Sequence, residues 1–112
     1  MFEYRARCVR VVDGDTLEMV ADLGFAVTYR FRCRLEGIDT PEIRGGTVES
    51  KAAGFAARDA AAEWVAAQPG RWPLVVSTSG RSFDRWVGVV RSATSGESLA
   101  DVLAMDGHAV AG

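Results

Sequence analysis

This sequence contains only two cysteines, one lysine and no long apolar stretch. No apolar run approaches the roughly 18–20 residues that a membrane-spanning helix needs, so we expect no membrane partner. Residues 1–5 also lack the basic region and following apolar stretch of a secretory signal. We therefore expect a cytoplasmic protein, unless a leader was removed before residue 1.

The two cysteines, Cys8 and Cys33, both fall in segments that read as strands. Small secreted scaffolds usually carry more cysteines, which favours two reduced core residues over a disulfide. Neither cysteine has a second one at the CxxC spacing of a zinc site. The cysteines are therefore interpreted as packing residues.

A strong charge of one sign is also missing, because 13 basic residues stand against 15 acidic ones, for a net charge of −2. Nucleic-acid-binding proteins usually present a basic surface, so the overall charge does not favour such a partner. It does not exclude a nuclease, because metal-binding carboxylates raise the acid count and an active site needs only local positive charge. Nearly all of the positive charge is arginine, with Lys51 the only lysine.

The 112 residues suffice for one domain with one modest core, and their 48% hydrophobic content is typical of globular proteins. We expect residues 1–112 to form a single domain. Hydrophobic patterns and turn residues predict strands at 5–12, 16–21, 25–35, 72–78 and 85–91. The remaining elements are expected at 22–24 (hairpin turn), 37–47 (loop), 48–67 (helix), 79–84 (loop) and from the N-cap Ser98 onward (helix).

The clearest pattern is a period-two alternation from Phe25 to Leu35, with apolar residues at the odd positions. Such alternation places one face on a core and the other outward, so Arg30, Arg32 and Arg34 share the outer face. A strand this long commonly bends around a small barrel. The order of three strands, a helix, two strands and a short helix matches a five-stranded OB barrel, which is a mainly β fold with α-helices.

The first predicted helix carries a narrow apolar stripe at helical spacing. The stripe consists of Ala53, Ala56, Ala57, Ala60 and Trp64.

Carboxylates and arginines cluster where the predicted strands end. The sequence DGDT at 13–16 forms the turn between the first two strands. Arg34 and the sequence DTPE at 39–42 lie at the end of the third strand, and Asp84-Arg85 enters the fifth. In an OB barrel these segments can converge on one side of the sheet.

Phosphodiester cleavage needs such a set of groups. A hard cation takes oxygen ligands from carboxylates and backbone carbonyls, neutralises a phosphate oxygen and helps to orient the attack. A carboxylate can remove the proton from the attacking water. Two arginines can bind the equatorial phosphate oxygens as charge builds on them.

Three segments of the chain resemble the active-site segments of staphylococcal nuclease and its relatives. They are VVDGDTLEM, RLEGIDTPEIRG and FDRWVGVV, in the order and with spacing similar to those of the family. The resemblance extends from about residue 5 to 110. It implies an OB barrel and a calcium-dependent enzyme that hydrolyses DNA and RNA and leaves 3′-phosphate ends.

The resemblance also implies a role for each matching residue. Asp15 and Asp39 would bind Ca²⁺ through their carboxylates, and Thr40 would bind it through its backbone carbonyl. Glu42 would act as the general base or position the water.

The arginines of the matching segments would act on the phosphate. Arg34 would clamp it and stabilise the transition state. Arg85 would do the same from the other side and assist the leaving 5′ oxygen. Phe83 stands where the family often has tyrosine, which implies a weak role in substrate binding.

Each of these residues also has an ordinary interpretation. Asp13 is interpreted as a turn former, and Asp15 could be one too, because an aspartate side chain can bond the local backbone. Asp39 and Glu42 flank a proline and could be plain loop residues. Arg34 could be a solvated residue like its equivalents on the same strand face. Trp86 could stack on bases, but it is interpreted as a packing residue of the core or its rim.

Three departures from the family pattern predict weaker substrate affinity. Asp84 stands where the family usually has glycine, residues 106–112 lack the aromatics that stack on the substrate base, and the net charge is acidic. None of them removes a residue of the catalytic set.

Two other functions compete with a nuclease. The first is a non-catalytic OB module that binds nucleic acid or protein, and such copies typically lose the carboxylates or arginines that this chain retains. The second is an accessory protein of a mobile element that keeps the motif. The sequence leaves open DNA against RNA and the oligomeric state, with a monomer slightly favoured.

Overall fold

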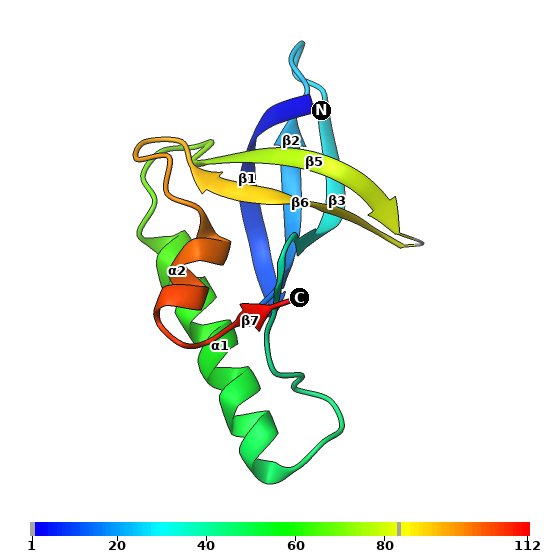
Figure 1. Ribbon diagram of the computed structural model, residues 1–112. Coiled ribbons are helices and arrows are strands. Elements are labelled where there is room, and N and C mark those ends of the chain that lie inside the picture. Colours follow the sequence, from blue (N-terminus) through cyan, green and yellow to red (C-terminus); the bar gives the residue numbers. More distant parts are fainter. Residues whose placement is uncertain (1, 83) are drawn as a thin grey trace.

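Five strands of the computed structural model, which describes residues 2–82 and 84–112, wrap into a closed barrel in the order β1-β2-β3-β6-β5 (Figure 1). The barrel strands are β1 (Phe2–Asp13), β2 (Thr16–Asp22), β3 (Thr28–Leu35), β5 (Leu74–Ser82) and β6 (Arg85–Ser92). All neighbouring pairs are antiparallel except β3 and β6, which run parallel. This mixed barrel is consistent with an OB-like fold, as predicted.

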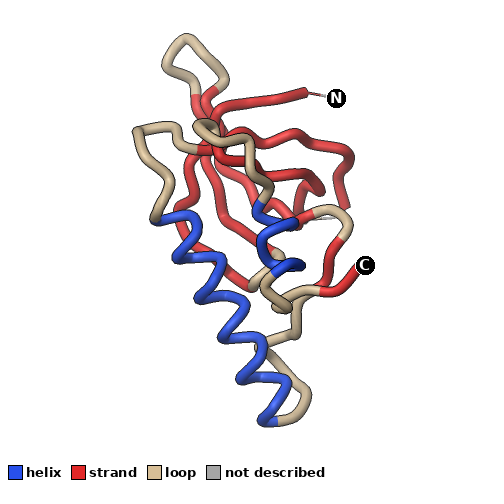
Figure 2. The backbone as a smooth tube through the Cα atoms, turned by 60° about the vertical axis from the view of Figure 1, so that its left-hand side comes forward, coloured by secondary structure: helices blue, strands red, loops and turns tan. Residues whose placement is uncertain are grey.

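The other elements lie outside the barrel. They are β4 (Ile38–Asp39), α1 (Val48–Ala66), α2 (Leu99–Met105) and β7 (Val110–Ala111). The helix α1 connects the third and fourth barrel strands, as expected, and β4 pairs with β7 in a small separate sheet. Figure 2 shows α1 extending past one end of the barrel, while the β2–β3 loop projects from the other end. Among the described residues, no helix is long and apolar enough to cross a membrane.

One core joins the inside of the barrel to the two helices. Leu17, Met19 and Val90 are fully buried within the barrel, and Leu99 and Leu103 join them from α2. The strand positions 31, 33 and 35 face this core, as their alternation predicts. Both cysteines are free thiols, and burial raises the pKa of Cys33 to about 12.

The prediction that β3 begins at Phe25 is wrong, because the chain turns there and β3 begins at Thr28. Gly24, Phe25 and Ala26 have φ values of 82°, 53° and 61°, which form a left-handed turn. The amide of Leu23 donates to the carbonyl of Val27 across this turn at 2.9 Å. Phe25 and Val27, which alternation assigned to the core face, therefore lie outside β3 and are exposed.

The predicted loop over 79–84 is also wrong for most of its length. β5 continues to Ser82, and Arg81 pairs with Trp86 in β6. A register shift between Thr78 and Gly80 interrupts the pairing. Such a β-bulge lets a strand continue through a stretch rich in serine and glycine, which reads as a loop in the sequence.

The face that α1 turns to the barrel differs from the predicted stripe. Its buried residues are Gly54, Ala57, Ala61 and Trp64. Ala57, Ala60 and Trp64 of the predicted stripe are fully or partly buried, whereas Ala53 and Ala56 are exposed. The buried set keeps helical spacing but consists mostly of the smallest residues, which allows the helix to approach the neighbouring loops closely.

Candidate active site

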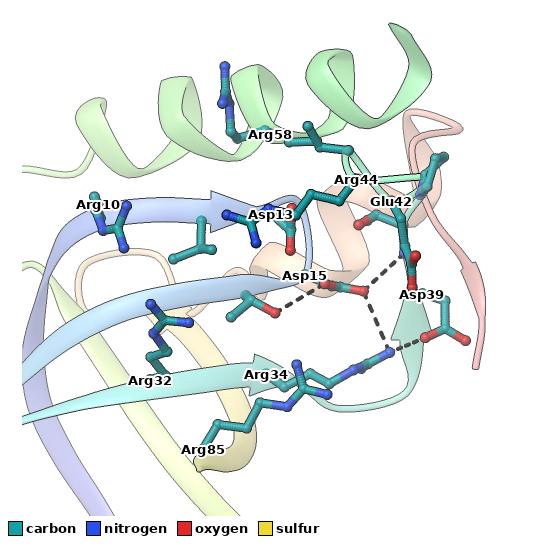
Figure 3. Close-up of a pocket in the computed structure, with 15 residues that line it drawn as sticks. Arg10, Asp13, Asp15, Arg32, Arg34, Asp39, Glu42, Arg44, Arg58 and Arg85 are labelled. Atoms are coloured by element: carbon teal, nitrogen blue, oxygen red, sulfur yellow. Dashed lines mark hydrogen bonds and ion pairs between the residues drawn. The ribbon is translucent and has the colours of Figure 1, made fainter. Parts of the chain in front are cut away.

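The six residues predicted as catalytic or metal-binding all line one pocket of about 900 Å³ (Figure 3). They are Asp15, Arg34, Asp39, Thr40, Glu42 and Arg85. Asp13, interpreted as a turn residue, lines the pocket as well. Phe83 lies outside the described residues. The structure therefore brings together side chains from all three motif segments.

Strand pairing explains why distant segments meet here. The register of β2 and β3 sets Thr16 opposite Arg34, which brings the DGDT turn to the end of β3. The parallel pairing of β3 with β6 sets Arg34 beside Val87, so Arg85 enters the pocket from the next strand. Figure 3 shows both arginines on neighbouring strands at one side of the pocket.

Arg34 is held from both sides of its guanidinium. Its Nη1 donates to the backbone carbonyls of Leu35 at 2.7 Å and Ile38 at 2.9 Å. Its Nη2 forms an ion pair with Oδ1 of Asp39 and lies 3.5 Å from Oδ2 of Asp15. These contacts distinguish Arg34 from the other arginines on its strand face, which alternation alone makes equivalent.

Asp15 links the DGDT turn to the DTPE loop. Its Oδ2 accepts a hydrogen bond of 3.2 Å from the backbone amide of Thr40, and its Oδ1 accepts one from the hydroxyl of Thr16. Only 15% of its side chain is exposed. A loop aspartate held only by its own turn would not make the contacts to Thr40 and Arg34, so the plain turn interpretation does not describe Asp15.

Close packing against α1 fixes the two motif loops. A Cβ atom on Gly14 would lie 2.8 Å from Cβ of Ala57 and 2.9 Å from Oγ1 of Thr40. A Cβ atom on Gly54 would lie 2.8 Å from the carbonyl oxygen of Pro41 and 3.1 Å from that of Glu42. Such distances are too short for any larger side chain, so both glycines are required for the present arrangement. Gly54, as a glycine within a predicted helix, is the sequence signal for its own close contact with the DTPE loop.

The pocket is locally basic although the protein is acidic. Its lining contains six arginines and four carboxylates. The arginines are Arg10, Arg32, Arg34, Arg44, Arg58 and Arg85. Arg32 was interpreted as an ordinary outer-face residue, although alternation already placed it beside Arg34. Arg58 comes from α1 on the opposite wall (Figure 3), which the strand pattern could not reveal.

A row of ion pairs extends the basic surface across β1, β2 and β3. Glu18 accepts hydrogen bonds from Nε of Arg10 at 2.6 Å and from Nε of Arg30 at 2.9 Å. These bonds hold the pKa of Glu18 below its usual range. The carboxylate therefore orients Arg10, which lines the pocket, and Arg30, which lies outside it.

The oxygen atoms at the centre of the pocket suit a hard cation. The carboxylates of Asp15 and Asp39 contact the same nitrogen of Arg34, so they face a common point, and the peptide of Thr40 adjoins Asp15. Across the described part of the chain, no three acidic, histidine or cysteine side chains lie close enough to hold an ion by themselves. An ion bound here would therefore need oxygen ligands besides the carboxylates of Asp15 and Asp39.

The Asp84 position shows no strain of the kind that a glycine would relieve. Among the described residues, only Phe25 and Ala26 combine a side chain with a positive φ. Aspartate therefore fits the backbone just before Arg85.

Comparison of the sequence with models of protein families and with curated proteins finds no match.

Proposed function

We propose that the protein is a calcium-dependent nuclease of the staphylococcal-nuclease type. It would hydrolyse phosphodiester bonds of DNA and/or RNA, with the 5′ oxygen as leaving group and a 3′-phosphate product. The observation that supports this most is the convergence of three motif segments on one basic pocket, where Arg34 contacts both Asp15 and Asp39. A cytoplasmic location stays a prediction.

Two arginines would bind the phosphate. Arg34 is half-buried and held by two backbone carbonyls, so its guanidinium is oriented before a substrate arrives. Arg85 enters the same pocket from the adjacent strand. Paired guanidinium groups can donate several hydrogen bonds to the equatorial oxygens, and preorganised donors stabilise charge that develops there.

The carboxylates would divide the remaining work. Asp15, Asp39 and the carbonyl of Thr40 would hold Ca²⁺, which when bound supplies positive charge to a phosphate oxygen. Glu42 is exposed on the pocket wall and would accept the proton of the attacking water. Arg34 contacts both carboxylates, so its guanidinium would bind the phosphate beside the residues that hold the ion.

The pocket composition offsets the unfavourable overall charge. Two more arginines than carboxylates line the pocket, and the Arg10–Glu18–Arg30 row continues beyond it. Such local charge attracts a polyanion even when the protein as a whole is acidic. We therefore expect binding that weakens strongly as salt rises.

The direct test is cleavage of single-stranded DNA and of RNA by the purified protein with Ca²⁺, with Mg²⁺ and with EDTA. We expect cleavage that requires Ca²⁺. A folded protein that cleaves neither substrate in any buffer would instead support a non-catalytic OB module. Binding of the same oligonucleotides without turnover would then be the activity to measure.

A further inference from the structure

A second hollow opens at the end of the barrel opposite the DGDT turn. It has a volume of about 310 Å³, and no charged residue lines it. Its aromatic lining consists of Phe2, Tyr4, Tyr29, Phe31 and Trp86. The indole Nε1 of Trp86 donates to the hydroxyl of Tyr29 at 3.3 Å, which gives the indole N–H a partner within the lining. The hollow thus presents an apolar surface to solvent.

Several exposed apolar side chains line this hollow or belong to the β2–β3 loop that follows its lining residue Leu23. Phe25 is fully exposed, and Phe2, Val27, Leu23 and Tyr29 are 70%, 52%, 44% and 42% exposed. Ala6 of β1 pairs with Ala21 of β2, so the start of β1 and the β2–β3 loop lie at the same end of the barrel. Together they expose an apolar area on the order of 500 Å², as large as the largest apolar patch of a typical monomer, and such patches are often functional.

The β2–β3 turn displays Phe25 at a conformational cost. Phe25 and Ala26 both adopt the left-handed backbone that favours glycine, although glycine precedes them at position 24. Residues held in this region cost free energy, and they occur preferentially at functional sites. The turn therefore lowers the free energy of unfolding while it holds an aromatic side chain in water. A hairpin with only a structural role would not require this.

We propose that this end of the barrel is the interface of a two-fold symmetric homodimer, in which Phe25 of each copy enters the aromatic hollow of the other. A two-fold interface uses the same patch on both copies, and this patch contains both a projecting group and a hollow. The hollow is at the small end of ligand pockets, and its size suits one aromatic side chain.

The contact area and charge favour a second copy over other occupants. Burying on the order of 500 Å² of apolar surface on each copy supplies more than half of the ~800 Å² per partner in a standard interface. A nucleic-acid strand would require cations, and the hollow has none in its lining. The dimer leaves the pocket at Asp15 and Arg34 open at the far end of each barrel, so the inference does not depend on the nuclease proposal.

The test is the mass of the full chain in solution, measured by sedimentation velocity from low micromolar to submillimolar concentration. We expect a dimer for the wild type and a monomer for Phe25→Asp and Phe25→Gly. The matched control is Val48→Asp, because Val48 is 85% exposed on α1, away from the hollow. It should dimerise like the wild type.

A second measurement separates the displayed side chain from the strained turn. Phe25→Gly and Phe25→Ala both remove the aromatic group, but only glycine relieves the left-handed backbone. We expect both to be monomeric and Phe25→Gly to melt at the higher temperature. A monomeric wild type at all concentrations, Phe25 variants that dimerise normally, or binding of the monomer to phospholipid vesicles through Phe25 would overturn the proposal.

Discussion

The two ends of the barrel differ in the chemistry of their side chains and in how firmly those side chains are held. At the end near Asp15, charged side chains are tied to one another and to backbone carbonyls, and small residues of α1 hold the loops. At the end near Phe25, the side chains are apolar, exposed and carried by a left-handed turn. Ion pairs and close packing fix the geometry of the first end, whereas the second end is left incomplete in a single copy. The proposed chemistry and the proposed association follow from this difference.

The largest expected effect is the loss of turnover when a charged side chain is removed from the pocket. Glu42→Gln should reduce turnover by about 10²–10⁴-fold, since it removes the proposed proton acceptor. Arg85→Ala should reduce it by about 10²–10³-fold, through loss of a donor to the developing charge. Both should keep the wild-type melting temperature. Steady-state kinetics and thermal melting measure the two quantities.

The matched control for Arg85→Ala is Arg30→Ala. Arg30 lies on the outer face of β3 and bonds Glu18, but it does not line the pocket. It should change turnover little and affect mainly the salt dependence of binding. Equal losses in the two variants would show that the effect is one of general charge, which would contradict the assigned site.

The next effect concerns the ion. Asp39→Ala should weaken Ca²⁺ binding by roughly tenfold or more, because one of two carboxylate ligands is removed. Titration calorimetry with Ca²⁺ alone measures this without any substrate. Asp84→Ala is the control, because Asp84 is exposed and does not line the pocket. Unchanged Ca²⁺ affinity in Asp39→Ala would reject this residue as a ligand.

A smaller effect tests the packing that positions the loops. Gly54→Ala places a methyl group against the carbonyls of Pro41 and Glu42, so it should displace the loop and lower turnover about tenfold or more. The added atom should also reduce the free energy of unfolding by about 1–3 kcal/mol. Gly80→Ala is the control, because a Cβ atom there would meet nothing within 4 Å. Normal kinetics in Gly54→Ala would mean that the loop adapts freely.

The smallest expected effect concerns the reactivity of the two cysteine thiols, which depends on their burial. Burial raises the pKa of Cys8 to about 11 and that of Cys33 to about 12, from an ordinary value of 9.0. Folding therefore favours the neutral thiols, and this contribution is complete below pH 9.0 and lost as the pH rises toward the raised values. We expect slow alkylation of both thiols at pH 8 and fast alkylation in denaturant. Rapid reaction of the folded protein would contradict the packing of β1 and β3.

The sequence predicts the fold better than it predicts burial. Alternation correctly placed positions 31, 33 and 35 on the core, but it also assigned Phe25 and Val27 to the same face. Alternation reports only which residues share a face, and burial depends on what covers that face. In α1, alanines surround most of the helix, so the pattern could not select the buried row containing Gly54 and Ala61.

For the site, the motif segments identified the residues that share the pocket, because strand order brings strand ends together. Arg44 and Arg58 could not be predicted, because their positions depend on how the loop and α1 pack on the barrel. Neither the close approach at Gly14 nor the row through Glu18 is visible in local patterns. Both depend on register across strands and on distances between elements.

The measurement that tests the account most directly is cleavage of a 5′-labelled single-stranded DNA by wild type and Glu42→Gln, with Ca²⁺ and with EDTA. We expect fragments with 3′-phosphate ends only for the wild type with Ca²⁺. Equal cleavage in EDTA, equal cleavage by Glu42→Gln, or no cleavage by the folded wild type would contradict it.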